Sequence, residues 1–211
     1  MLNLVAAAET DPAMPNGRGR TPGSIHENNT PANWRSLVNE ITNATFNATH
    51  FYYYGHGGPR GIGFSENTPT DGILSDEIAL GLRNARRPFV DESGNLRFNI
   101  NRPYRFVFLN GCNTANGLLA ESFGIPAILK KTLPLSQKRL FLGWTTTQYN
   151  SIANNAHIQF SQRFWNEWLP VNGPYDSVSA SVAIRIAAAA YPAVSTNSLA
   201  RFGDQSLKWM E

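Results

Sequence analysis

Two short runs of the sequence are almost entirely apolar and aromatic, and each ends beside glycine. The first, HFYYYGHGG, leads to His56, and the second, YRFVFLNGC, leads to Cys112. Runs of this length and composition, bounded by glycine where the chain must turn, predict buried strands. We therefore expect a sheet whose strand ends carry His56 and Cys112 in tight turns.

Segments with helical spacing of apolar residues alternate with the strand-like runs. Strands are predicted over 2–8, 50–54, 104–110, 139–146 and 199–203, helices over 30–46, 75–87, 114–124, 151–169 and 177–192, loops over 9–31 and 57–75, and a hairpin over 88–101. This alternation predicts an α/β fold with a mostly parallel sheet, helices on both of its faces and a small hairpin insertion. Sites in such sheets lie at the carboxyl ends of the strands, where His56 and Cys112 are expected.

The pair of residues suits nucleophilic catalysis. A thiol is intrinsically very nucleophilic, and a neighbouring imidazole suffices to activate it. The helix predicted over 114–124 would place Cys112 at its amino end, where the helix dipole favours thiolate. Taken singly, a lone cysteine is more often a small buried hydrophobe, and a histidine in a glycine-rich turn is more often only a turn residue. Their joint occurrence at strand ends favours a cysteine hydrolase.

Four segments resemble caspase-like (clan CD) cysteine peptidases, and the CHAT-type and gingipain-type domains most closely. HFYYYGHGG is similar to their strand and His-Gly turn, and FVFLNGCNTANG to their second catalytic strand and Cys turn. RLFLGWTTTQ resembles the next core strand with its Gly-Trp pair, and RFGDQSLKW the closing strand. The resemblance spans about residues 25–209, and the spacing of His56 and Cys112 is near the roughly 50 residues typical of caspases.

The resemblance implies a cysteine endopeptidase that forms a thioester on Cys112, with His56 as acid and base and no third catalytic residue. It also implies an oxyanion site made by the backbone N–H groups of Gly57 and Cys112. The closer relatives favour cleavage after basic residues, which needs a carboxylate in the substrate pocket. The carboxylate candidates near strand-end loops are Asp71, Asp76 and Asp176, and Arg60 is the candidate for the opposite, acidic preference.

The front of the chain is short for this family. Residues 1–31 supply one strand and a loop before the core at 32–211, whereas relatives begin with a strand, a helix and a second strand. Two interpretations stay open: a single domain of 1–211 that lacks its first strand and helix, or an abbreviated relative that closes its sheet differently. The resemblance to peptidases implies a protein or peptide substrate. Relatives are commonly fused to regulatory domains, so we also expect a fused or associated regulatory domain.

Composition argues against several other classes of protein. The 18 Lys and Arg against 15 Asp and Glu give a charge of only +3, in scattered positions, which does not indicate nucleic-acid binding. One cysteine and four dispersed histidines imply no disulfide framework and no metal, and no cofactor is expected. No apolar run is long enough to span a membrane and no secretory signal is evident, so a cytoplasmic location is expected.

Two alternatives to a peptidase remain open. A non-catalytic caspase-like scaffold or sensor domain of a larger protein would keep the sheet without the chemistry. A flavodoxin-like binder would share the alternation of strands and helices but should carry a glycine-rich phosphate loop after its first strand. The run from Gly55 to Gly63 lacks a Lys-Ser or Lys-Thr pair, so it does not match a phosphate loop.

Overall fold

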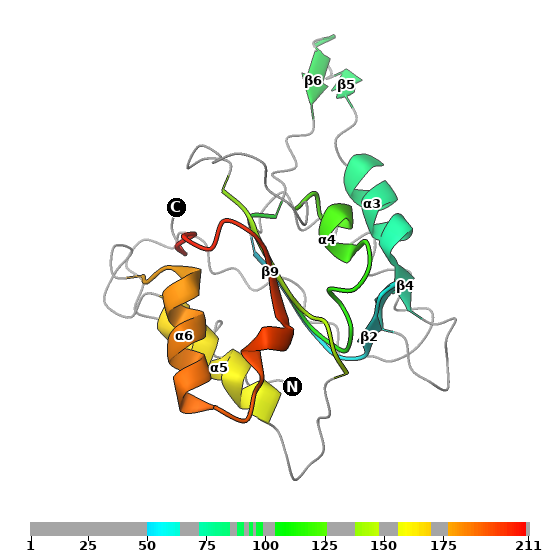
Figure 1. The fold of residues 1–211 in the computed structure, drawn as a ribbon. Helices are drawn as coiled ribbons and strands as arrows, with labels where there is room; N and C mark the ends of the chain where they lie inside the picture. Colours follow the sequence, from blue (N-terminus) through cyan, green and yellow to red (C-terminus); the bar gives the residue numbers. More distant parts are fainter. Residues whose placement is uncertain are drawn as a thin grey trace.

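A computed structural model describes residues 50–63, 72–84, 88–90, 93–94, 96–98, 104–125, 138–147, 156–169 and 177–209. Within this part the fold is mixed α/β, built on a mostly parallel four-stranded sheet (Figure 1). Three predicted elements lie outside the described residues: the strand over 2–8, the loop over 9–31 and the helix over 30–46. The two interpretations of the front of the chain therefore stay predictions.

The main sheet has the strand order β1-β7-β8-β9, with β1 (His50–Tyr54), β7 (Phe106–Asn110), β8 (Leu140–Trp144) and β9 (Leu199–Gly203). β1 pairs with β7 and β7 with β8 in parallel, whereas β9 is antiparallel to β8. Every residue of β7 and β8 is buried, as strands covered on both faces require. The predicted strands at 104–110, 139–146 and 199–203 are therefore confirmed.

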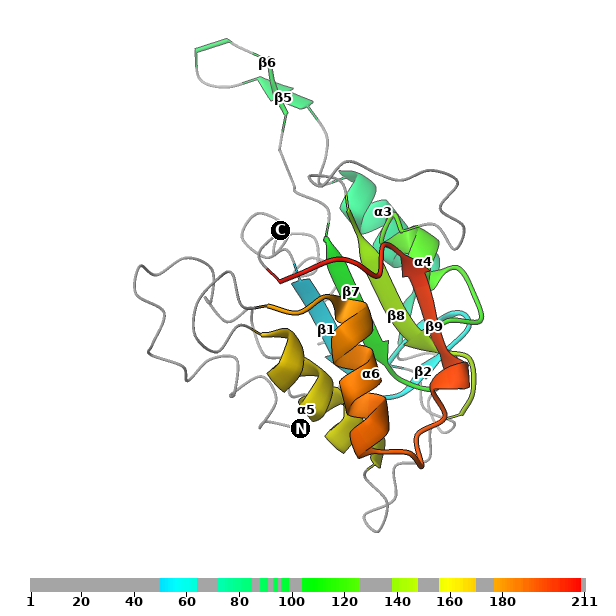
Figure 2. The same ribbon diagram turned by 60° about the vertical axis from the view of Figure 1, so that its left-hand side comes forward.

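Helices cover both faces of this sheet, as Figure 2 shows. On one face lie α5 (Ala156–Trp168) and α6 (Ala180–Ala190), and on the other α3 (Ser75–Asn84) and the short α4 (Leu119–Ser122). Strand alternation divides the core accordingly: Phe106 and Phe108 of β7 pack toward α5 and α6, whereas Val107 and Leu109 pack toward α3 and α4. The expected arrangement of helices on both faces is confirmed.

Two smaller sheets accompany the main one. β5 (Pro88–Val90) and β6 (Leu96–Phe98) form the predicted antiparallel hairpin, which projects away from the main sheet in both views. β2 (Gly57–Gly58), β3 (Gly61–Ile62) and β4 (Ile73–Leu74) form a three-stranded antiparallel sheet directly after the His56 turn. The prediction of a continuous loop over 57–75 is thus wrong at both ends, because two-residue strands there are too short to produce a periodic pattern.

The helix predicted over 114–124 is also shorter than expected. Residues 111–118 form turns and bends, and α4 begins only at Leu119, seven residues after Cys112. The expectation that a helix dipole acts on Cys112 is therefore wrong. Thr114 takes part in other hydrogen bonds instead of capping a helix, since its hydroxyl lies 2.9 Å from the Leu109 carbonyl oxygen and 3.0 Å from that of Gly111.

Candidate functional site

The register of β1 and β7 places the two candidate residues at the same level of the sheet. Tyr54 and Asn110 are paired as the last residues of their strands, and each chain continues for two residues, to His56 and to Cys112. Because the strands are parallel, both turns emerge at the same, carboxyl edge of the sheet. The expectation that strand ends of one sheet carry His56 and Cys112 in turns is confirmed.

The backbones of the two turns are in contact. A methyl group on Gly57 would lie 2.5 Å from Thr114 Cγ2 and 3.2 Å from the carbonyl oxygen of Cys112. Further along, a methyl group on Gly117 would collide with the carbonyl group of Pro59. The glycines therefore permit an approach of the His56 turn to the Cys112 turn that any side chain at these positions would obstruct.

Side-chain exposure differs between the two candidates. His56 is exposed in its turn, and the side chain of Cys112 is half-buried. The carbonyl group of His56 accepts hydrogen bonds from the Tyr53 hydroxyl at 2.6 Å and from the Gly63 N–H at 2.7 Å. These bonds fasten the backbone of the His56 turn while leaving its imidazole accessible.

The turn after Cys112 is held by β8 and by the segment that follows it. Asn113 has a left-handed backbone (φ 53°), and its N–H donates to the Thr146 carbonyl at 3.1 Å. The Asn116 side chain donates to the Thr145 carbonyl at 2.7 Å. This chain reversal brings residues 145–147 beside the Cys112 turn, so both segments border the same edge of the sheet.

A buried polar cluster lies directly beneath these turns. It consists of Tyr52, Asn110, Trp144 and Ser161, which come from β1, β7, β8 and α5. Burial raises the pKa of the Tyr52 hydroxyl to about 12, with hydrogen bonds from Asn110 and Ser161 acting in the opposite direction. Tyr52 is therefore a neutral partner of this cluster throughout the physiological range.

Two other ionisable groups near the site are shifted by their surroundings. Burial raises the pKa of Tyr54, and its electrostatic interaction with the nearby Cys112 acts in the same direction. Burial lowers the pKa of His157, whose ring packs edge-on against Trp144 with centroids 4.7 Å apart. His157 thus packs on the side of α5 that faces β8.

Four polar residues in this region were missed as site residues at the sequence level. They all lie in or next to the run NGCNTAN: Asn110, Asn113, Thr114 and Asn116. The sequence does contain a signal for them, because three amide side chains and one hydroxyl follow directly after an apolar strand. Their hydrogen-bond partners on other elements lie 29 to 58 residues away in the sequence, so a search for sequence patterns could not find these contacts.

The specificity candidates are only partly described. Asp71 and Asp176 lie outside the described residues, and Asp76 is exposed in the first turn of α3. The N–H of Ser75 donates to the Arg60 carbonyl at 2.9 Å, so α3 begins beside the turn between β2 and β3. Asp76 and the exposed Arg60 are therefore carried by neighbouring segments on the His56 side of the site.

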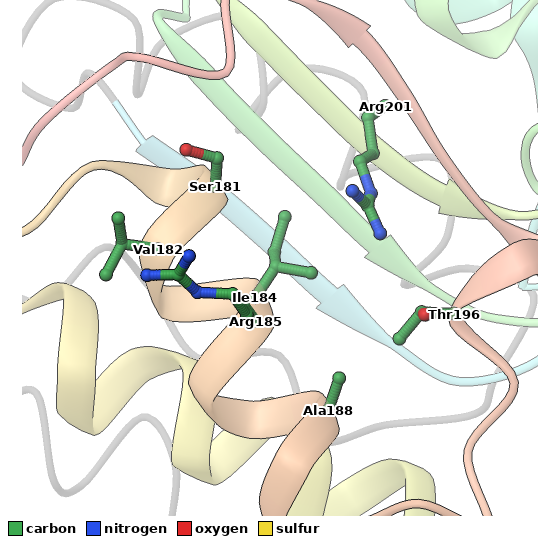
Figure 3. A pocket seen from close by; sticks show the side chains of 7 residues that line it. All are labelled: Ser181, Val182, Ile184, Arg185, Ala188, Thr196 and Arg201. Carbon is green, nitrogen blue, oxygen red and sulfur yellow. The ribbon is translucent and has the colours of Figure 1, made fainter.

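A pocket of about 390 Å³ lies elsewhere, between α6 and β9. Its lining consists of Ser181, Val182, Ile184, Arg185, Ala188, Thr196 and Arg201, and it contains no residue of the two turns. In Figure 3 the guanidinium groups of Arg185 and Arg201 point in different directions. The pocket is thus separate from the His56 and Cys112 turns, and its two cations do not converge on one point.

No group of three or more His, Cys, Asp or Glu side chains that could hold a metal ion occurs among the described residues. No described helix is long and apolar enough to cross a membrane.

Comparison with protein-family models and with curated proteins found no match to this chain. Its function is therefore inferred from its own residues.

Proposed function

We propose that the chain is a caspase-like cysteine endopeptidase, with Cys112 as nucleophile and His56 as general acid and base. The observation that carries the proposal is the in-register pairing of β1 with β7, which brings a thiol and an imidazole out at one edge of a parallel sheet on touching turns. The exposure of His56 and the partial burial of Cys112 suit a site that a peptide can reach from solvent.

The reaction proceeds in two steps. The Cys112 thiol gives its proton to His56, and its sulfur attacks the carbonyl carbon of the scissile peptide bond. The carbonyl oxygen becomes an oxyanion next to the N–H groups of Gly57 and Cys112. The C–N bond then breaks, and His56 gives a proton to the departing amine. In the second step His56 takes a proton from water as the water oxygen attacks the thioester. The C–S bond breaks, His56 returns the proton to the Cys112 sulfur, and the acid product is released.

Substrate preference is proposed for basic residues before the cleaved bond. Among the described carboxylates, Asp76 at the start of α3 is the candidate on the His56 side of the site, because Ser75 beside it is hydrogen-bonded to Arg60. An exposed carboxylate attracts Lys or Arg but contributes modestly in water. Asp76→Asn is therefore expected to raise KM for a basic substrate several-fold while kcat changes little.

The test is covalent labelling of Cys112 by peptide ketones that carry Lys, Arg or Asp at the cleavage position. Mass spectrometry should find one adduct, on Cys112, formed fastest with Lys or Arg. Cys112→Ala should abolish labelling and peptide cleavage, and His56→Ala should lower cleavage by about 10²-fold or more, in the range expected for general acid–base catalysis.

The same experiment addresses the non-catalytic scaffold. A scaffold would react with the ketones no faster than the unfolded chain does, and would cleave none of a peptide library. Either full activity in the Cys112→Ala variant or equal labelling of folded and unfolded protein would refute the proposal.

A further inference from the structure

Asn110 occupies the point from which both turns depart. It is the last residue of β7, only 1% exposed, two residues before Cys112 and paired with Tyr54, which is two residues before His56. The other four residues of β7 are apolar. A buried amide costs free energy unless its hydrogen bonds are made, so the position demands an account of its partners.

The Asn110 side chain has partners on three other elements. Its Nδ2 donates to Ser161 Oγ of α5 at 2.8 Å and to the Tyr52 hydroxyl of β1 at 3.3 Å. Its Oδ1 accepts from Trp144 Nε1 of β8 at 2.7 Å. The amide therefore has a single orientation, fixed from both neighbouring strands and from the helix that covers them.

The backbone of Asn110 carries this orientation to the site. Its carbonyl oxygen accepts the N–H of Gly55 at 3.4 Å, immediately before His56. The next residue, Gly111, leads into Cys112, and a methyl group on it would lie 2.7 Å from the carbonyl oxygen of Gly55. One anchored residue thus governs the direction of the Cys112 turn and its distance from the His56 turn.

We propose that Asn110 is a positioning residue for the His56 and Cys112 pair, acting through its buried bonds to Tyr52, Trp144 and Ser161. The inference rests on the proposed function and adds to it the element that keeps the two turns aligned. An apolar residue would fill the same core space without orienting the strand end, so a purely packing role would not need the amide.

Two tryptophans provide a matched pair of variants. Trp144 and Trp168 are both fully buried in the same core cluster, and each uses its indole N–H in one hydrogen bond. Trp144 donates to Asn110, whereas Trp168 donates to the Leu207 carbonyl at 3.2 Å, which is not part of either turn. Trp144→Phe and Trp168→Phe therefore remove similar volume and one buried bond each, but only the first weakens the hold on Asn110.

The experiment measures alkylation of Cys112 by iodoacetamide at neutral pH, in each background with and without His56→Ala. Cys112 is the only cysteine, so the reaction reports one site. A thiol with an imidazole beside it is more reactive than an isolated thiol, so His56→Ala should slow alkylation of the parent protein about tenfold. Thermal unfolding of every variant is recorded alongside.

Loss of alignment should appear as loss of this His56 effect. We expect it to fall below about twofold in Asn110→Ala, to about threefold in Trp144→Phe, and to stay near tenfold in Trp168→Phe, because the thiol gains reactivity only while the imidazole stays beside it. If Asn110→Ala does not fold, Tyr52→Phe removes one partner while keeping the ring, and an intermediate effect is expected.

Each other outcome has a definite meaning. A full tenfold effect in folded Asn110→Ala, or an equal loss in both tryptophan variants, overturns the positioning role and leaves the peptidase proposal standing. No His56 effect in the parent protein overturns the catalytic pair itself, and the positioning role with it.

Discussion

At the scale of single residues, the site depends on how closely two backbones approach. Gly57 faces the methyl group of Thr114 and the carbonyl oxygen of Cys112, whereas its neighbour Gly58 has open space where a side chain would go. The Thr114 hydroxyl accepts a hydrogen bond from the backbone N–H of Trp144 in β8 at 3.2 Å. This bond holds the Thr114 side chain, and so its methyl group, in one orientation. The contact of Gly57 with Thr114 therefore sets the distance between the His56 and Cys112 turns. Rotating a side chain would not relieve a clash at this contact, because Thr114 is buried and hydrogen-bonded.

Gly57→Ala should separate the two turns, since its methyl group would lie 2.5 Å from Thr114 Cγ2. We expect peptidase activity to fall at least tenfold and the protein to be destabilised by about 1–3 kcal/mol, the usual cost of overpacking. Gly58→Ala is the control and should leave both quantities nearly unchanged. Cleavage assays and chemical denaturation of the two variants measure this; equal behaviour would contradict the contact.

At the scale of elements, α6 approaches its neighbours closely because its buried face is nearly all alanine. Ala180, Ala183 and Ala187 are fully buried together with Ile184 against the face of the sheet shared with α5. Small residues let helix axes come close, but they leave no room for larger side chains. The sequence pattern predicted this helix and its end near Pro192, while the identity of its partner came from the packing.

Ala183→Leu should overpack this contact. Alanine and leucine have similar helix propensities, so the expected loss of about 1–3 kcal/mol in the free energy of unfolding comes from packing alone. Ala189→Leu, on the exposed side of α6, is the matched control and should change stability by less than about 0.5 kcal/mol. Urea denaturation of both variants checks this. Equal stabilities would mean that α6 does not pack as described.

At the scale of the whole molecule, a histidine packs against the edge of the aromatic core. His50, at the start of β1, stacks on Trp209 with ring centroids 4.0 Å apart and meets Trp168 edge-on. Burial, helped by the charge of Arg105, lowers the pKa of His50 to about 3 from its usual 6.5. The folded protein therefore holds a neutral imidazole under conditions in which the unfolded chain binds a proton.

Because of this difference, the free energy of unfolding decreases as the pH is lowered below 6.5. Between pH 6.5 and about 3 the unfolded state binds one more proton at His50 than the folded state, so acid favours unfolding by roughly 1.4 kcal/mol per pH unit. His50→Phe keeps an aromatic ring and removes this contribution. The difference in unfolding free energy between parent and variant, measured by denaturation at pH 7, 6, 5 and 4, should grow as the pH falls. Parallel curves would contradict the lowered pKa.

The sequence by itself determined the positions of the four strands of the main sheet, of the hairpin and of α3, α5 and α6, because apolar runs and glycine or proline boundaries act locally. It also selected His56 and Cys112, since both follow buried runs at a turn. It overestimated the helix after Cys112, where Asn113, Thr114 and Asn116 form bonds with β8, its following segment and the Cys112 turn instead of a helical turn.

Only the tertiary structure decided what lies around the pair. The in-register pairing of β1 with β7, the contact of Gly57 with Thr114 and the three partners of Asn110 all join residues distant in the sequence. Such contacts depend on how strands pair and which helix covers them, and no local pattern encodes that choice. His56 and Cys112 can thus each be recognised from the few residues around them. Their alignment, in contrast, depends on how the strands of the folded sheet pair.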